Sequence, residues 1–406
     1  MLTNDDKQNI MNEIVVLFED YIVNNYLTIQ NERFDEIIFQ ELYSILSLSY
    51  NKILDHQQLM EIKKIIYETL NICYRCIIPK RSYSKDLYIK KSFEKIKNRL
   101  EYLRNIPQPD QRTKEWYECR YNLLTASDFW KCFDTESNRN QIIYGKCKPL
   151  IVSDESETSV NENSSLHWGQ KYEPVSTALY EKMFDTEIEE FGCIPHSKYK
   201  FLGASPDGIN VCEKSPLYGR LLEIKNPTSR VLTGIPKKDY WCQTQLQMEV
   251  CGLNDCDLWE TIFKEYESYN EYVNDGNDYN RCENGNYKGI ILCFIINDKI
   301  IYKYPTLDIS KEEYDKWEKE TLLTYGEDNW MKNIYWKLED YKKTLILRNK
   351  FWFNKILIHV TELWNTILKE RVDGYEHRAP KKRVKSNNDS KSEFQPKVCL
   401  IKLCDL

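Results

Sequence analysis

The feature that most constrains this chain is a short apolar segment that carries charge, 220-RLLEIK-225. On a β-strand, residues i and i+2 project from the same face, so Glu223 and Lys225 would lie side by side while Ile224 faces the other way. Charges on an apolar strand are costly unless they pair with each other or bind a ligand. The segment therefore predicts a strand whose two charged residues are site candidates. A surface salt bridge on an edge strand is the simpler alternative.

Length, composition and charge narrow the class of protein. The 406 residues allow one large core or two to three domains, and 41% apolar with 30% charged residues is typical of a globular chain. A mean hydropathy of -0.64 argues against a membrane span, and the polar start does not resemble a secretory signal. The 14 cysteines lack the spacing of a disulfide framework, which favours an intracellular location. A net charge of -6 argues against a protein that coats DNA, but not against one that grips it locally.

The chain divides into three predicted parts. Residues 1–104 place apolar side chains three and four apart and predict a helical extension, which ends at the double-proline linker 105–110. Residues 105–370 predict an α/β domain, and residues 371–406 a basic tail of disordered composition. The helical extension is expected to be a structural or partner-binding module.

Within the central part, helical and strand patterns alternate. Helices are expected over 113–124, 167–184 and 239–253, and strands over 188–194, 201–209, 220–225 and 256–263. Residues 288–296 and 299–307 predict a hairpin around Asn297-Asp298, and residues 310–370 predict a long helical region. The acidic stretches 153–165 and 264–287 are expected to be surface loops.

Carboxylates flank the charged strand in a pattern that suits a divalent metal ion. Asp207 lies in Ser-Pro-Asp-Gly, which favours a turn, and Glu223 lies on the next strand, so a hairpin would bring both acids to one metal ion. Mg²⁺ or Mn²⁺ prefers oxygen ligands and is held by one or two carboxylates plus substrate phosphate. The backbone carbonyl of Ile224 is a further candidate metal ligand. Lys225 would orient or deprotonate the attacking water, or stabilise developing negative charge.

Further motifs precede and follow this segment in a fixed order. They are Trp116…Arg120…Thr125-Ala126-Ser127, Trp168-Gly169…Tyr172-Glu173, Ser205-Pro206-Asp207-Gly208, Leu222-Glu223-Ile224-Lys225-Asn226-Pro227 with Thr228-Ser229-Arg230, and Tyr240…Gln243-Thr244-Gln245…Met248. Over about residues 113–263 the chain resembles the YqaJ-type viral recombinase and phage lambda exonuclease family of the PD-(D/E)XK nuclease superfamily. The resemblance implies an α/β fold of the restriction-endonuclease type, with a mixed central sheet flanked by helices.

The resemblance also implies a role for each matching residue. The metal-site acids would be Glu173, Asp207 and Glu223, and the catalytic residues Lys225, Glu223 and Gln243. The residues that hold a 5′-terminal phosphate would be Arg120 and Ser127, with Ser205 and Arg230 as weaker candidates. Local chemistry agrees, because Ser127 would lie in the first turn after a Thr125 cap, where free N–H groups favour an anion and Arg120 adds a bidentate donor.

The implied function is a Mg²⁺-dependent DNA exonuclease that hydrolyses phosphodiester bonds from 5′-phosphorylated duplex ends, for recombination, repair or replication of viral DNA. Its partners would be double-stranded DNA ends, with a single-strand annealing protein and a second copy of the chain as further candidates. It would act inside a host cell, in a cytoplasmic viral factory or in the nucleus. An endonuclease of the same fold and a non-catalytic DNA-binding scaffold are the alternatives.

Three details call for a structural answer. Pro174 follows Glu173 directly, so the helix there is expected to begin near that point or to bend. Cys73 and Cys76 lack a second metal-binding pair and are expected to be buried thiols. The basic run 381-KKRVK-385 fits a nuclear localisation signal, a disordered DNA-binding arm, or neither.

Overall fold

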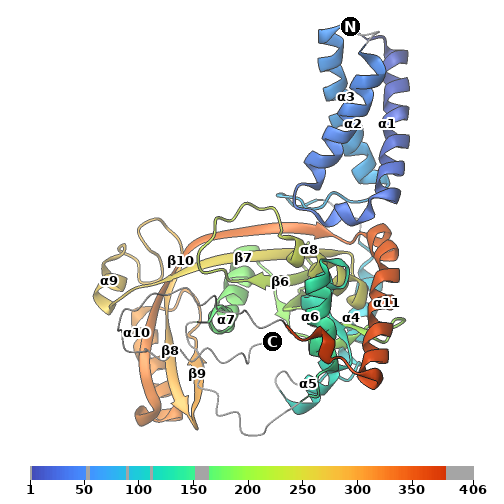
Figure 1. Cartoon of the computed structure of the whole chain (residues 1–406). Coiled ribbons are helices and arrows are strands. Elements are labelled where there is room, and N and C mark those ends of the chain that lie inside the picture. Colours follow the sequence, from blue (N-terminus) through green and yellow to red (C-terminus); the bar gives the residue numbers. More distant parts are fainter. Residues whose placement is uncertain (1, 52–54, 88–90, 110–112, 151–163, 381–406) are drawn as a thin grey trace, which may run out of the picture.

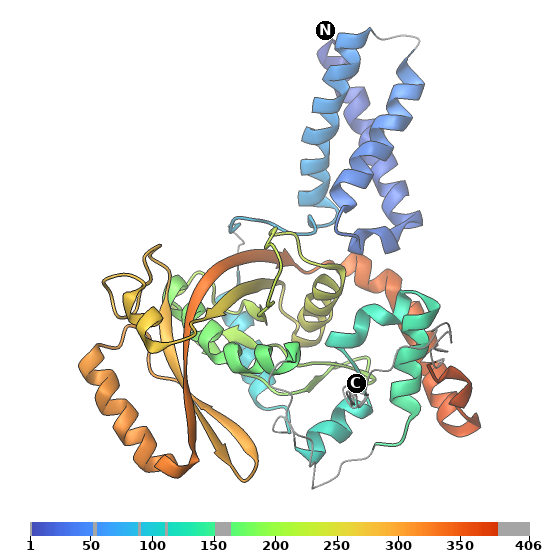
Figure 2. The ribbon, with the colours of Figure 1, turned by 60° about the vertical axis from the view of Figure 1, so that its left-hand side comes forward.

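The computed structural model describes residues 2–51, 55–87, 91–109, 113–150 and 164–380. A slender helical bundle at the N-terminus stands on a larger body, and Figures 1 and 2 show the two parts from two sides. The body contains a long mixed sheet with helices on both faces. The predicted α/β class with a mixed, helix-flanked sheet is therefore confirmed.

Three helices form the bundle: α1 Asn4–Asn24, α2 Phe34–Tyr50 and α3 His56–Cys76. Capping boxes at the start of α1 and α3 satisfy free N–H groups of the first turn. The inward stripes of the helices are fully buried, as Phe18, Ile38 and Ile66 illustrate. Of the two cysteines expected to be buried, Cys73 is buried and Cys76, at the helix end, is exposed.

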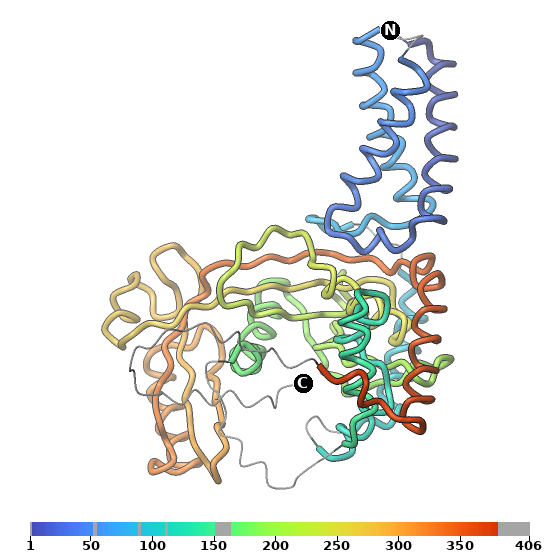
Figure 3. The backbone as a smooth tube through the Cα atoms, in the orientation of Figure 1, coloured from blue at the N-terminus to red at the C-terminus, as the bar shows by residue number. Residues whose placement is uncertain are grey.

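Seven strands form the main sheet in the order β2-β5-β6-β7-β10-β8-β9. Their bounds are β2 Ile188–Glu189, β5 Gly208–Asn210, β6 Leu221–Lys225, β7 Asp255–Glu265, β10 Trp330–Leu347, β8 Lys288–Ile296 and β9 Lys299–Lys303. Strands β6 and β7 are parallel, and the other neighbours are antiparallel. A parallel pair needs a crossover, which α8 (Lys238–Cys251) provides. Figure 3 shows how β7 and β10 run side by side across the body.

Two helices cover opposite faces of the β6–β7 pair. On one face, Ile224 packs with Tyr180 of α7 (Ser165–Phe184). On the other, Leu221 belongs to the same core cluster as Leu246 of α8. Because successive strand residues point to opposite faces, the charged residues of β6 lie on the α8 side.

The remaining elements gather at the two ends of the sheet. Beside β5 and β6 are a short linker helix α4 (Phe93–Arg104) and a small sheet of β1 (Leu124–Thr125), β4 (Leu202–Ala204) and β3 (Ile194–Pro195). That end also holds α5 (Lys114–Tyr121), η2 (Ala126–Phe133), α6 (Glu136–Cys147), α11 (Lys350–Asp373) and η4 (Glu376–Arg378), while α9 (Tyr269–Asn274), α10 (Lys311–Tyr325) and η3 (Glu327–Asn329) accompany β8 and β9. Among the described residues, no helix combines the length and the apolar character needed to cross a membrane.

The prediction of one helical region over 310–370 is wrong. Strand β10 occupies its middle and pairs with both β7 and β8. Ile334, Trp336 and Leu338 are buried at alternate positions, which is the period of a strand. The charged residues nearby favour a helix locally, but pairing along two neighbouring strands outweighs that preference.

Other expectations meet mixed outcomes. The hairpin of β8 and β9 is confirmed, and Asn297 and Asp298 both have positive φ, as a tight hairpin turn requires. Helix α4 begins at Phe93, inside the predicted helical extension, and the polar stretch 264–287 contains the short helix α9. Most of the acidic stretch 153–165 and the basic run 381–385 lie outside the described residues.

Candidate active site

The hairpin of β5 and β6 brings Asp207 to the strand that carries Glu223. Asp207 immediately precedes β5, and Gly208 pairs with Leu222 across the hairpin. The backbone N–H of Ile224 donates to Asp207 Oδ2 at 2.6 Å, which fixes this carboxylate beside β6. The sixteen-residue separation in sequence is thus closed by one antiparallel pairing.

Glu223 is the most extensively bonded acid of the cluster. Its side chain is 1% exposed, and its Oε1 accepts from Lys225 Nζ at 2.5 Å and from Gln243 Nε2 at 2.7 Å. Lys225 Nζ also donates to Gln243 Oε1 at 3.2 Å, so the three side chains form a closed triangle. The acid and the lysine lie on one face, as their spacing on a strand predicts.

Helix α8 supplies a second glutamine that the sequence analysis did not single out. Gln247 is fully buried, and its Nε2 donates to Glu223 Oε2 at 2.6 Å and to the Ser205 carbonyl at 3.3 Å. It follows Gln243 by four residues, which is the spacing that places two side chains on one helix face. Gln245 points away from the site and bonds the backbone between β10 and α11.

Glu173 approaches the cluster from α7, and its charge acts on Asp207. The helix starts at Ser165, is capped by the Ser164 side chain, and continues through Pro174 to Phe184. Of the two alternatives expected at Pro174, a helix start near the proline is therefore wrong, and a bend stays a prediction. Buried contacts on both sides of Pro174 outweigh the single helical hydrogen bond that proline removes.

Asn226 holds α7 against the sheet beside the cluster. Its Oδ1 accepts from Ser176 Oγ at 2.7 Å and from Thr261 Oγ1 at 2.5 Å, and its Nδ2 donates to the Gly169 carbonyl at 3.2 Å. Ser176 and Thr261 are fully buried, so these bonds are shielded from water. This network fixes the helix that carries Glu173.

The charges of the cluster are unequal. Burial raises the pKa of Asp207 well above its ordinary value, and the charges of Glu223 and then Glu173 raise it further. Burial alone would lower the pKa of Lys225, but Glu223 and Asp207 outweigh burial and raise it. At neutral pH the lysine is therefore an ammonium that donates hydrogen bonds, surrounded by more acid than one cation neutralises.

This donor set fits a divalent cation. In the part of the chain that the structure describes, no group of three or more His, Cys, Asp or Glu side chains is arranged to hold a metal ion. Mg²⁺ does not need such a group, because it keeps several waters and takes one or two carboxylates plus substrate phosphate. A cation near Asp207 and Glu223 would relieve the repulsion that raises the pKa of Asp207.

Arg120, Thr125 and Ser127 meet where α5 ends. Arg120 Nη2 donates to Thr125 Oγ1 at 3.4 Å and to Ser127 Oγ at 3.3 Å, both long for such bonds. The Trp116 ring lies against the guanidinium at 4.7 Å. These loose contacts leave the guanidinium able to exchange them for stronger bonds to an anion.

Thr125 does not act as the expected helix cap. Its hydroxyl is turned toward Arg120 and makes no capping hydrogen bond, and the segment after it is the 3₁₀ helix η2. Ser127 is nevertheless exposed within the first turn of η2, beside the guanidinium. The helix is therefore of a different type from the one expected, but Ser127 lies in its first turn as predicted.

Ser205 lies in the neighbourhood of Arg120. The Ser205 hydroxyl and the Arg120 charge both act on the thiol of Cys193, whose pKa burial raises to about 11. The carbonyl of Ser205 is also bonded by Gln247. Ser205 is therefore tied through its carbonyl to the same glutamine that bonds Glu223.

Arg230 has a different setting. It forms an ion pair with Glu260 and lies over the Tyr240 ring at 5.1 Å, while Lys225 lies over the same ring at 5.0 Å. Glu260 is 2% exposed and is the strand partner of Lys225 in the β6–β7 register. Arg230 thus sits beside the lysine of the acidic cluster. Glu260 was not predicted as a site residue, although an acid within a buried strand is the signal that the sequence offers.

The main sheet and its helices follow the order α7, β2, β5, β6, α8, β7, with the small-sheet strands β3 and β4 between β2 and β5. An acid before β5 and Glu-x-Lys on β6 agree with the PD-(D/E)XK fold class expected from the sequence. Residues 115–254 match the YqaJ-like viral recombinase domain. The family resemblance drawn from the ordered motifs is thereby confirmed for this part of the chain.

Similar proteins come from a virus and a bacterium. Over 332 residues, 71% of this chain, the sequence is 30% identical to the uncharacterized protein R354 of Acanthamoeba polyphaga mimivirus. The chain spans 58% of the length of that relative. An alkaline exonuclease (LHK-Exo) from Laribacter hongkongensis is 18% identical, with a TM-score of 0.39 over 64% of this chain and 94% of that one. For the same exonuclease in complex with dAMP the values are 19% and 0.38, over the same shares of the two chains.

Proposed function

We propose that this chain is a Mg²⁺- or Mn²⁺-dependent deoxyribonuclease that removes nucleotides from the 5′-phosphorylated ends of duplex DNA. The observation that carries the proposal is the placing of Asp207 beside Glu223, with Lys225 bonded to Glu223. An acid-rich buried cluster with one ammonium suits a metal-assisted attack on a phosphodiester. The YqaJ-like domain supports a nuclease of the viral recombination type.

The metal site would consist of Asp207 and Glu223, with Glu173 and the Ile224 carbonyl as further ligands. A bound divalent cation would lower the pKa of a bound water and neutralise charge on the scissile phosphate. Lys225 would orient that water or stabilise the negative charge that develops on the phosphate, because it is held as an ammonium.

The glutamines of α8 would set the geometry of this chemistry. Gln243 and Gln247 donate to different oxygens of Glu223, so the carboxylate is held in one rotamer. Groups that orient a metal ligand in this way typically change activity by about 10- to 100-fold when they are removed.

End selection would come from the residues around α5. Arg120 and Ser127, with Ser205 nearby, would bind a terminal phosphate, and Arg230 would contact the strand beside Lys225. A 5′-terminal phosphate bound there would give the enzyme a 5′-to-3′ direction and would leave 3′ single strands. Such ends serve recombination or repair of viral DNA inside a host cell, where a single-strand annealing protein is a suitable partner.

Digestion of linear duplexes with and without 5′-phosphates tests this proposal. We expect product only when Mg²⁺ or Mn²⁺ is present, and faster release from phosphorylated ends. Glu223→Gln should lower the rate about 10²- to 10³-fold, because the metal site loses a charged ligand. Glu249→Gln is the matched control, since Glu249 lies on α8 but pairs with Arg348 outside the cluster.

Two outcomes would contradict the proposal. Full activity of Glu223→Gln would show that the hydrolytic site lies elsewhere. Nicking of closed circular DNA at a rate comparable to the digestion of linear ends would indicate an endonuclease instead.

A further inference from the structure

Helix α5, which carries Arg120, has little packing of its own. It has eight residues, none of them buried. Helices shorter than about 12 residues are marginal in water without tertiary contacts. The Thr113 side chain caps its first turn at the Trp116 N–H, 3.2 Å away. What fixes the other end, where Arg120 lies, must come from neighbouring elements.

Two cations from other helices bond the last turn of α5. Lys146 Nζ of α6 donates to the Arg120 carbonyl at 2.7 Å. Arg371 of α11 donates from Nη2 to the Tyr121 carbonyl at 2.9 Å, and its Nη1 lies 3.4 Å from Asn122 Oδ1. Cations at this end of a helix satisfy its free carbonyls and complement its dipole.

Arg371 also bonds the backbone of the second cation, Lys146. Its Nε donates to the Lys146 carbonyl at 2.9 Å, so one guanidinium ties α11 to both α5 and α6. The guanidinium lies 4.3 Å from the Tyr121 ring and 5.5 Å from the Trp364 ring. A planar fork held between rings is a stiff support, which a lysine cannot reproduce.

The guanidinium of Arg120 is held less firmly than its backbone carbonyl. Its side-chain bonds to Thr125 and Ser127 are long, at 3.4 and 3.3 Å, whereas the bond from Lys146 to its carbonyl is 2.7 Å. Burial lowers the pKa of Lys146 to about 8, and the charges of Arg120 and Arg371 contribute to the decrease. Three cations therefore converge on one helix end, although like charges repel.

We infer that Arg371, assisted by Lys146, is a positioning residue for terminal-phosphate recognition: it sets α5 so that Arg120 faces the phosphate. The inference rests on the proposed function, because it requires Arg120 to bind that phosphate. An incoming phosphate would offset the charge that has been concentrated there. Without Arg371, α5 would sample several positions, and each would cost affinity for the phosphorylated end.

The test compares steady-state digestion of 5′-phosphorylated and 5′-hydroxyl duplexes by wild type, Arg371→Met and Arg120→Met. For Arg371→Met we expect the KM for phosphorylated ends to rise about tenfold, the loss expected for one charged hydrogen bond. Its kcat on those ends should stay within about twofold of wild type. Arg371→Lys should recover only part of the affinity.

Arg378→Met is the matched control. Arg378 follows α11, pairs with Glu370 and contacts Asn140 of α6, but it does not bond α5. It should leave the KM for phosphorylated ends at the wild-type value. Where Arg371→Met lowers the thermal midpoint more than Arg378→Met does, Lys146→Met replaces it, because that variant deletes the bond to the Arg120 carbonyl.

The results distinguish a failure of the proposed phosphate pocket from a failure of the role given to Arg371. If wild type shows no preference for phosphorylated ends, the proposed phosphate pocket fails and the inference falls with it. If Arg120→Met abolishes the preference while Arg371→Met and Lys146→Met keep it, the proposed function stands and the inference alone is wrong. A fall in kcat at constant KM, or the same KM shift in Arg378→Met, would reduce Arg371 to a general packing role and overturn the inference.

Discussion

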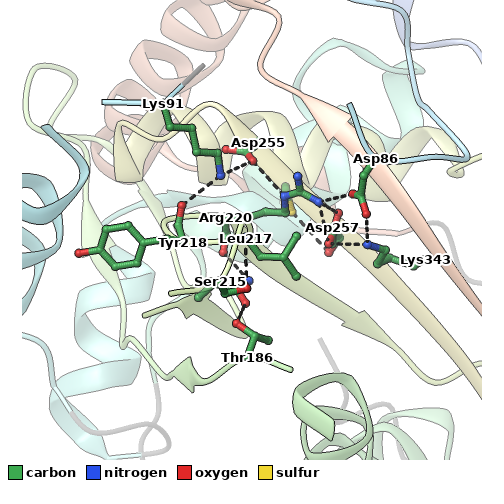
Figure 4. A network of polar contacts seen from close by, with 12 residues as sticks. Asp86, Lys91, Thr186, Ser215, Leu217, Tyr218, Arg220, Asp255, Asp257 and Lys343 are labelled. Atoms are coloured by element: carbon green, nitrogen blue, oxygen red, sulfur yellow. Dashed lines mark hydrogen bonds and ion pairs between the residues drawn. The ribbon is translucent and has the colours of Figure 1, made fainter. Parts of the chain in front are cut away.

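The β6–β7 region carries two clusters of buried charge, one on each face of the sheet, and they are built on different principles. The cluster on the α7 face, shown in Figure 4, holds three cations and three carboxylates: Arg220, Lys91, Lys343, Asp86, Asp255 and Asp257. On the α8 face, Lys225 is bonded to Glu223 and its charge acts on Asp207, and the charge of Glu173, which belongs to α7, also acts on Asp207. The two clusters differ in the balance of the charges that they hold.

In the balanced cluster every charge finds a partner within the protein. Arg220 donates to Asp255 at 2.9 Å, to Asp257 at 3.0 Å and to Asp86 at 2.6 Å. Asp86 lies in the segment between α3 and α4, so the network attaches that segment to the sheet. A buried network that is complete has no need of a ligand.

In the acidic cluster, Lys225 is bonded to Glu223, and Asp207 accepts from the backbone N–H of Ile224. Burial, Glu223 and Glu173 together raise the pKa of Asp207. Burial also raises the pKa of Asp257 in the balanced cluster, but there the charges of Arg220 and Lys343 oppose the shift. Carboxylates with perturbed pKa values of this kind cluster at functional sites. The balance of charge therefore distinguishes the structural cluster from the candidate active site.

The largest effect that would test this contrast is expected for Arg220→Met. Removing the central cation leaves Asp255 and Asp257 buried without their main partner, so the free energy of unfolding should fall by about 3–5 kcal/mol. Denaturant unfolding measures it, and digestion per folded molecule should stay near wild type. A loss under about 1 kcal/mol would show that the network is solvated and structurally dispensable.

Metal binding should produce the next largest effect, and only at the acidic cluster. Mg²⁺ at about 100 times its Kd should stabilise wild type by about 2.7 kcal/mol, because it binds the folded state. Asp207→Asn should lose most of this gain, whereas Asp257→Asn, a buried acid of the balanced cluster, should keep it. Thermal unfolding with Mg²⁺ and with EDTA compares the three proteins. Equal stabilisation of Asp207→Asn and wild type would place the metal elsewhere.

A smaller effect is expected from Gln247→Leu. Glu223 would lose one of its two glutamine donors, and digestion should slow by about 10- to 100-fold with little change in fold. Gln245→Leu should do the opposite, because Gln245 bonds the backbone of Leu347 and Asn349 instead of the cluster. It should lower the free energy of unfolding and leave the activity of the folded molecules intact. Equal activity losses in the two variants would deny Gln247 a specific role.

The sequence was sufficient to predict the acidic hairpin because its signals are local. A Pro-Asp-Gly turn and an i, i+2 pair on one strand depend on neighbouring residues alone, and the structure pairs β5 with β6 accordingly. Strand β10 could not be recognised in this way. Its residues favour a helix locally, and its strand character comes from β7 and β8, which are distant in sequence.

The same limit applies within the site. Gln243 was found through an ordered motif, whereas Gln247 needed the knowledge that α8 turns this face toward Glu223. The bond from Arg371 to the Tyr121 carbonyl of α5 joins residues 250 positions apart, and no local sequence pattern predicts it. Contacts between distant segments are therefore where the structure adds most to the sequence.

The smallest expected effect is a difference in sign between two aspartates as pH changes. The pKa of Asp207 is raised in the fold, so the folded state keeps its proton longer than the unfolded chain, and stability falls as pH rises above about 4. Near neutral pH, without divalent metal, Asp207→Asn should therefore be more stable than wild type by on the order of 1 kcal/mol. This difference should vanish below about pH 4, where both states are protonated.

Asp86 should show the opposite sign. Burial alone would raise its pKa, but hydrogen bonds from Lys343 and Arg220 outweigh burial and lower it. Its contribution to stability is therefore present above about pH 4 and is lost as pH falls through the lowered value. Asp86→Asn should be less stable than wild type at neutral pH, by less than about 1 kcal/mol because the side chain is half exposed. Denaturant unfolding in EDTA from pH 3 to pH 7 measures both differences, and two variants with the same sign would abolish the distinction between the clusters.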